Sequence, residues 1–181
     1  MIDLSAYQNH HYHSGAGIVK RTLWYFMNHL VFTHSFLPFY GFKKIILVAF
    51  GAKIGKGFVI KPAVNIKYPW NLEVGDYVWL GEKVWIDNLD KVKIASNVCI
   101  SQGAMVITGN HQFDAPTFDL IVKPVNIEEG VWIGAKAMVA PGVTCKSHSL
   151  LTMGSVATAS LEPYAVYKGN PAAKVKDRVF K

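Results

Sequence analysis

Residues 54–86 read IGKGFVIKPAVNIKYPWNLEVGDYVWLGEKVWI, and an aliphatic residue returns every six positions through most of this stretch. The spacing continues to residue 157, so that five triplets share one pattern: Ile54, Ile60, Ile66; Val74, Leu80, Ile86; Ile94, Ile100, Val106; Ile127, Ile133, Val139; Cys145, Leu151, Ala157. A period of six fits neither a helix, at about 3.6 residues, nor a single strand, at about 2. Fixed hexapeptides are typical of a parallel β-helix, in which stacked coils form one continuous core. The sequence therefore predicts an all-β solenoid of about five coils.

The irregular steps in this count indicate where loops leave the solenoid. The steps after Ile66 and Ile86 are eight residues long, and the step after Val106 is 21. Each follows the third member of a triplet, so if three sides make one coil, all insertions lie at the same corner of a triangular prism. The long insertion, residues 107–126, is then the expected functional loop, because long loops in compact repeat proteins usually carry function.

Length and composition indicate one domain with appendages. The chain has 181 residues, of which 51% are hydrophobic and 17% charged, and this composition argues against disorder. We expect an N-terminal arm and helical cap in residues 1–50, the β-helix in residues 51–160 and a tail with a short helix in residues 161–181. The helix is expected after residues 169–171, Gly-Asn-Pro, which break the repeat and place proline at an early helical position.

The net charge of +7 suits an anionic partner, but no basic helix interleaved with exposed aromatic residues is visible, and we expect no nucleic-acid binding. Cys99 and Cys145 are not spaced as a zinc or redox pair. His10, His11 and His13 lack further ligands, so no metal is expected. Residues 1–17 lack the apolar core of a signal peptide, which favours a cytoplasmic location.

The N-terminal segment contains two apolar stretches that predict helices, residues 18–34 and 42–50. Neither is an uninterrupted run of about 20 apolar residues, so a spanning helix is not expected. Two interpretations remain open. The helices cap the exposed end of the first coil, or they anchor the protein at the interface of the inner membrane through aromatic residues beside Lys20, Arg21, Lys43 and Lys44.

The long insertion contains one histidine, His111, within TGNHQFDAPTFDL (residues 108–120). Histidine can take up and release a proton near neutral pH, which suits a general acid or base. Its position on the single long insertion of a regular solenoid makes His111 the candidate catalytic residue.

Several motifs together resemble the hexapeptide-repeat acyltransferases: IGKGFV (residues 54–59), VWIGAKAMVAPGVT (131–144), MGSVAT (153–158) and KGNPA (168–172). The motifs DLSAYQN (3–9), VWIDNLD (84–90), VCISQGA (98–104) and the His111 loop are similar to the colanic-acid-type acetyltransferases of exopolysaccharide biosynthesis. The resemblance implies a left-handed β-helix, a homotrimer with sites at subunit interfaces, and acetyl-CoA as cosubstrate without a metal.

The resemblance also implies roles for individual residues. His111 would remove a proton from an acceptor hydroxyl of a glycan or small molecule, and the backbone N–H of Ala135 would stabilise the oxyanion. Acceptor-binding positions are expected at Asn88, Asn110, Asp114 and Trp132. Positions that would contact coenzyme A, besides Ala135, are Gly154, Ser155, Thr158, Lys176 and Arg178.

The preferred function is O-acetylation of a sugar hydroxyl in exopolysaccharide or cell-surface glycan synthesis. A xenobiotic, such as antibiotic, or other small-molecule acetyltransferase would use the same donor chemistry. A non-catalytic scaffold is the third interpretation. A metal-dependent hydratase on the same solenoid would need three inward histidines, and the coils offer only His148 beyond His111.

Overall fold

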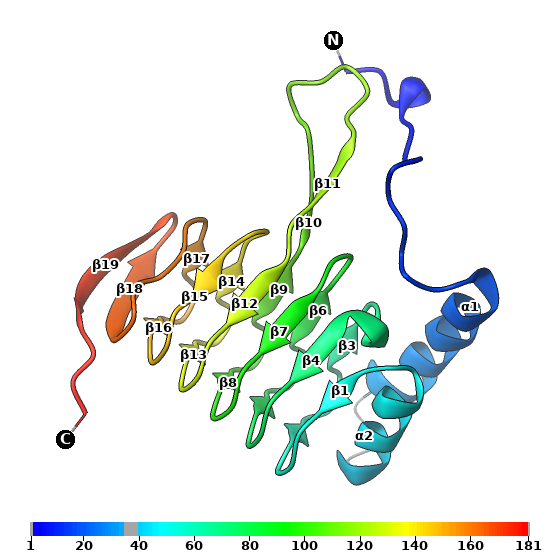
Figure 1. Cartoon of the computed structure of the whole chain (residues 1–181). Helices are drawn as coiled ribbons and strands as arrows, with labels where there is room; N and C mark the ends of the chain where they lie inside the picture. The colour runs from blue at the N-terminus through cyan, green and yellow to red at the C-terminus, as the bar shows by residue number, and fades with distance from the viewer. Residues whose placement is uncertain (1, 35–39, 181) are drawn as a thin grey trace.

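The computed structural model describes residues 2–34 and 40–180 and shows a parallel β-solenoid with helices at its N-terminal end (Figure 1). Three sheets, named A, B and C, form its sides. Sheet A contains β1 (Lys53–Ile54), β4 (Leu72–Val74), β7 (Val92–Ile94), β12 (Val125–Ile127) and β15 (Thr144–Cys145). Sheet B contains β2 (Val59–Ile60), β5 (Trp79–Leu80), β8 (Cys99–Ile100), β13 (Trp132–Ile133), β16 (Leu150–Leu151), β18 (Ala165–Gly169) and β19 (Ala172–Asp177). Sheet C contains β3 (Asn65–Ile66), β6 (Trp85–Asp87), β9 (Met105–Ile107), β14 (Met138–Val139) and β17 (Val156–Ala157).

The strand register confirms the hexapeptide prediction. Ile60 pairs with Leu80 and Leu80 with Ile100, so equivalent positions of successive coils form one column. All fifteen predicted inward positions except Ile54 are buried. The sequence analysis did not predict a second buried position in each hexapeptide, two residues before the predicted inward residue. Phe58 and Val64 occupy this position, and most of the residues at the equivalent positions are also apolar. Residues two apart in a strand face the same side, so each hexapeptide contributes two side chains to the core.

The solenoid extends slightly further than five coils, and its tail is not helical. Leu161 bridges Cys145, and β18 adds a further strand to sheet B. The predicted C-terminal helix is wrong, because residues 172–177 form β19, which pairs antiparallel with β18. Gly169, Asn170 and Pro171 lie at the turn between these strands. Pairing satisfies backbone groups at the edge of β18 that a helix in the tail would leave open.

Helices pack against the opposite end, where the first coil begins. They are α1 (Ile18–Met27), the π-helical turn η2 (Asn28–Phe32) and α2 (Tyr40–Ala49), whereas the short η1 (Leu4–Ala6) lies in the N-terminal arm, away from the first coil (Figure 1). The indole N–H of Trp24 donates to the Ile66 carbonyl at 2.9 Å, and Phe32 and Leu47 are fully buried. The inner faces of α1, η2 and α2 therefore cover the apolar end of the first coil. Within the two described ranges, no helix is long and apolar enough to cross a bilayer.

All three insertions leave the solenoid at the corner between sheets C and A, as the spacing predicted. They follow β3, β6 and β9 and stack on one another. The longest projects as a hairpin of β10 (Gly109–His111) and β11 (Leu120–Val122), beside which the N-terminal arm runs (Figure 1). This corner therefore gathers the irregular parts of the chain.

Candidate active site

The hairpin holds His111 in a defined orientation. His111 is the last residue of β10, and its ring stacks on Phe118 with centroids 4.3 Å apart and planes inclined by 5°. Its Nδ1 lies 2.9 Å from the Phe118 carbonyl oxygen. Because a carbonyl oxygen can only accept, Nδ1 carries the hydrogen and Nε2 of the neutral ring keeps its lone pair. The imidazole is therefore arranged to accept a proton at Nε2.

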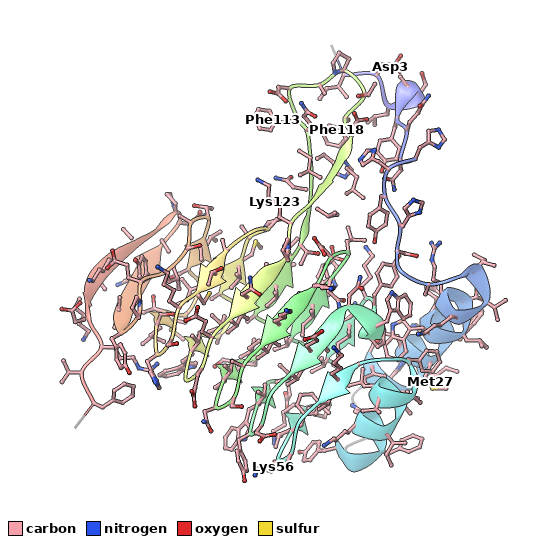
Figure 2. The ribbon with its side chains drawn as sticks, viewed as in Figure 1. Asp3, Met27, Lys56, Phe113, Phe118 and Lys123 are labelled. Atoms are coloured by element: carbon pink, nitrogen blue, oxygen red, sulfur yellow. The ribbon has the colours of Figure 1, made fainter. Side chains whose placement is uncertain are left out.

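The other loop positions expected to bind an acceptor lie at the surface. The side-chain oxygen of Asn110 accepts from the backbone N–H of His111 at 2.8 Å, within β10. Asp114 is exposed near the hairpin tip. Figure 2 shows the neighbouring Phe113 on the side of the hairpin that faces away from the N-terminal arm.

The N-terminal arm packs along the other side of the hairpin. The Asp3 N–H donates to the Pro116 carbonyl at 2.9 Å, and His11 Nε2 lies 3.1 Å from the Leu120 carbonyl oxygen. The Tyr7 ring centroid is 6.1 Å from that of His111. The arm thus forms one wall of the space in front of the histidine.

Between the arm and the hairpin lies a cavity of about 430 Å³. Its lining includes Tyr7, Asn9, Tyr12, Arg21, Lys67, Tyr68 and His111. Burial raises the pKa of Tyr12, so its hydroxyl stays neutral and donates to the Leu89 carbonyl at 3.1 Å. Sequence reasoning had missed the arm, helix and first-coil residues of this lining, since no motif or period links them to residue 111.

Asn88 supports this cavity from beneath. Its side chain is fully buried, accepting from the Tyr68 N–H at 2.9 Å and donating to the Tyr68 carbonyl at 2.6 Å. Both polar atoms are therefore used to join the first insertion to the second. Beside it, Lys67 Nζ lies 2.9 Å from Asp87 Oδ1. Asn88 thus holds Tyr68, which lines the cavity, and its expected contact with an acceptor stays a prediction.

Trp132 and Ala135 lie on a different corner of the prism. The indole N–H of half-exposed Trp132 donates to Ser101 Oγ at 2.9 Å. Ala135 follows β13 at the corner between sheets B and C, and its carbonyl accepts from the Gly154 N–H at 2.9 Å. The Ala135 N–H makes no hydrogen bond to residues 2–34 or 40–180. A single chain therefore does not bring this donor to His111.

Of the positions expected to contact coenzyme A, some are exposed and others form hydrogen bonds within the chain. Gly154, Thr158 and Lys176 are exposed. Ser155 is buried, and its hydroxyl accepts from the Gly169 N–H at 3.0 Å, which holds the C-terminal hairpin. Its hydroxyl is therefore not presented to a ligand in this chain.

Arg178 likewise has a structural use. Its Nη1 donates to the carbonyls of Gly130 at 3.0 Å and His148 at 3.1 Å, and burial lowers the pKa of Arg178. This guanidinium fastens the tail across two coils. Lys176 remains the free basic candidate for a phosphate contact.

Across the described parts of the chain, no group of three or more His, Cys, Asp or Glu side chains is placed to hold a metal ion.

Comparison with known proteins identifies relatives of the whole chain. No protein-family model matches it. The chain is 35% identical over 179 residues, covering 99% of itself and 98% of the relative, to "Putative colanic acid biosynthesis acetyltransferase WcaF" of Escherichia coli K12.

Solved structures show the same fold. A hexapeptide-repeat acetyltransferase from Vibrio cholerae superposes with a TM-score of 0.81 at 19% identity, covering 90% of this chain and 92% of the other. A galactoside acetyltransferase in complex with coenzyme A gives 0.80 at 22% identity, covering 89% and 82%. These are left-handed β-helices, which agrees with the expected fold class.

The resemblance drawn from the motifs is thereby confirmed. Identity of 35% over nearly the full length of both chains is a relationship of family and not of isolated hexapeptides. The chain belongs to the hexapeptide-repeat acetyltransferases, in the group that contains WcaF.

Proposed function

We propose that the protein transfers an acetyl group from acetyl-CoA to a sugar hydroxyl in the synthesis of an exopolysaccharide or cell-surface glycan. The observation that carries this proposal is His111, which lines a cavity and whose Nδ1 hydrogen is held by the Phe118 carbonyl. The cavity, at about 430 Å³, is within the usual size range of small-molecule sites. The kinship with WcaF and the galactoside enzyme favours a glycan as the acceptor.

In the proposed reaction His111 Nε2 takes the proton of the acceptor hydroxyl while the hydroxyl oxygen attacks the thioester carbonyl carbon. The resulting oxyanion accepts a hydrogen bond from the Ala135 N–H, which is free in the isolated chain. When the intermediate collapses, the carbon–sulfur bond breaks, the acetyl ester remains on the sugar, and the thiolate of coenzyme A receives the proton from His111. No covalent enzyme intermediate is required.

His111 and Ala135 must come from different subunits for this reaction. Outward-facing apolar side chains form columns on sheets B and C, with Trp79 59%, Trp85 40% and Trp132 44% exposed. Such columns are costly against water and typical of a surface covered by another copy. We infer a homotrimer in which the B–C corner of one subunit meets the hairpin of the next. Gly154, Thr158 and Lys176 would then border the coenzyme A channel.

The test measures release of free thiol from acetyl-CoA with a panel of glycans, nucleotide sugars and antibiotic hydroxyls. His111→Asn should lower kcat by about 10²- to 10⁴-fold with little change in the KM for acetyl-CoA. His13→Asn is the matched control, because His13 is exposed and does not line the cavity. If His111→Asn kept wild-type turnover, His111 would not be the general base.

Two further results would redirect the proposal. Turnover confined to antibiotics would assign a xenobiotic acetyltransferase, and no binding of acetyl-CoA would favour a scaffold. Sedimentation analysis that finds a fully active monomer would exclude a site shared between subunits.

A further inference from the structure

The outer faces of α1, η2 and α2 are apolar although they do not touch the solenoid. Val19, Leu23, Phe26 and Leu30 follow helical spacing along one face of α1 and η2. Together with Phe42, Ile45 and Val48 of α2, each is between 47% and 69% exposed. Residues that cap the solenoid, such as Trp24 and Leu47, lie on the inner faces. A cap requires one apolar face per helix, so the second face needs another explanation.

The two outer faces form one continuous surface. A shallow groove between the helices is lined by Val19, Lys20 and Leu23 from α1 and by Ala49 and Phe50 at the end of α2. Figure 1 shows both helices side by side beyond β1, at the end of the solenoid opposite to β19. We call this surface, made of the seven outer apolar residues, the N-terminal face.

The end of the molecule that bears the N-terminal face is strongly cationic. Residues 4–72 contain eight lysines and arginines and no aspartate or glutamate. Among the described residues, Lys53 and Lys67 are the only two of these eight that lie within 4.0 Å of a carboxylate. Lys20 and Arg21 of α1 are next to the outer apolar residues in the chain. Lys43 is buried, which leaves five basic side chains at this end without a carboxylate within 4.0 Å among the described residues.

Charge decides between two occupants of this surface. A second copy docking through the same face would bring two cationic ends together, which is unfavourable. An anionic bilayer offers apolar tails to the exposed side chains and negative headgroups to the lysines and arginines. Basic residues are attracted to an anionic membrane surface, and amphipathic helices lie in this interface with their apolar side buried.

We propose that the N-terminal face docks the protein on the surface of an anionic lipid bilayer. The helices lie in the interface without crossing it. α1 also contributes Arg21 to the cavity in front of His111, so docking would hold the acceptor site close to the lipid headgroups.

Vesicle co-sedimentation tests this proposal without any acetyl-CoA or acceptor. The probes are vesicles of phosphatidylcholine alone and of phosphatidylcholine with phosphatidylglycerol at about 3:1. We expect binding to the anionic vesicles only, reduced in about 0.5 M NaCl because salt screens the attraction.

The double variant Leu23→Glu/Ile45→Glu should lower the bound fraction at least about tenfold, since two apolar side chains that would be buried in the lipid are replaced by charged ones. Phe113→Glu is the matched control, because Phe113 is 78% exposed but lies at the hairpin tip. Circular dichroism and thiol release with a soluble acceptor should stay at wild-type levels in the double variant, as neither residue lines the cavity.

Three results would overturn the proposal. They are absence of binding to anionic vesicles, equal binding by the folded double variant, and a smaller assembly in sedimentation analysis of that variant, which would assign the face to a second copy. None of these results depends on acetyl transfer, so failure here leaves the proposed enzyme activity intact.

Discussion

Replacement of Gly134 by alanine is expected to force two coils apart. Gly134 follows β13, where the next coil passes directly beside it. A Cβ at this position would lie 2.5 Å from Met153 N, 2.8 Å from Thr152 C and 2.9 Å from Leu151 O, all of them backbone atoms. Ordinary contact begins at 3.4 Å, so the coils must separate by about 0.9 Å, the difference between 3.4 and 2.5 Å. The 2.8 Å hydrogen bond from the Gly134 N–H to the Leu151 carbonyl must then lengthen.

The expected loss of stability follows from these two effects. Overpacking costs about 1–3 kcal/mol, and loss of one backbone hydrogen bond costs about 1 kcal/mol more. The total is about 2–4 kcal/mol, and for a chain of this length each kcal/mol lowers Tm by about 2–4 °C. Thermal unfolding should therefore occur about 4–16 °C lower. Thiol release should also fall, because Gly134 sets the backbone that presents the Ala135 N–H.

Differential scanning calorimetry provides the assay, with Gly41→Ala as the control. A Cβ on Gly41 in α2 meets no atom of the described residues within 4 Å, so alanine should raise stability by up to about 1 kcal/mol through helix propensity. The two glycine-to-alanine changes are thus expected to have opposite signs. A Tm for Gly134→Ala within about 1 °C of the wild type would refute the close approach of the two coils.

Two buried groups give further predictions. Burial lowers the pKa of Lys43, whose ammonium has no hydrogen-bond partner among the described residues. Lys43→Met should therefore raise the free energy of unfolding by about 1–3 kcal/mol. A lower Tm for this variant would indicate that the ammonium is favourably paired in the wild type. Burial raises the pKa of Cys145 to about 12, whereas an unfolded thiol titrates near about 8.5. Between these values the unfolded state alone loses the proton, so stability falls as pH rises, by up to about 1.4 kcal/mol per unit. In urea titrations from about pH 8 to 10, Cys145→Val should flatten this slope, and an unchanged slope would contradict the assignment.

Much of the fold could be predicted because it depends on a local repeat. The spacing of Ile60, Leu80 and Ile100 placed them in one column, and the register confirms it. The irregular steps placed the His111 hairpin at the corner shared by the other insertions. The tail was mispredicted because Gly-Asn-Pro suits a hairpin turn as well as a helix start, and the choice depends on the unpaired edge of β18.

The site was predicted less completely than the fold. His111 was predicted from its place on the long insertion, but the arm that faces it lies about 100 residues away in sequence, as the contact of His11 with Leu120 shows. Asn88, Ser155 and Arg178 matched motif positions expected to contact acceptor or coenzyme A. The structure shows that each bonds to backbone groups of another coil or the tail. A sequence motif does not distinguish a polar side chain directed at a ligand from one directed at a carbonyl.

The sequence by itself determined the stacking of hexapeptide coils and the corner that carries His111. Burial of one apolar column fixes both the strand register and the side of the prism that each hexapeptide forms. Tertiary structure alone decided which polar groups remain free for chemistry. A polar side chain is not free when it bonds to a backbone group of the neighbouring coil, the arm or the tail that would otherwise lack a hydrogen-bond partner. It also showed that α1 and α2 have apolar surfaces on two sides, since only the packed solenoid reveals which side it covers and which side stays exposed among the described residues.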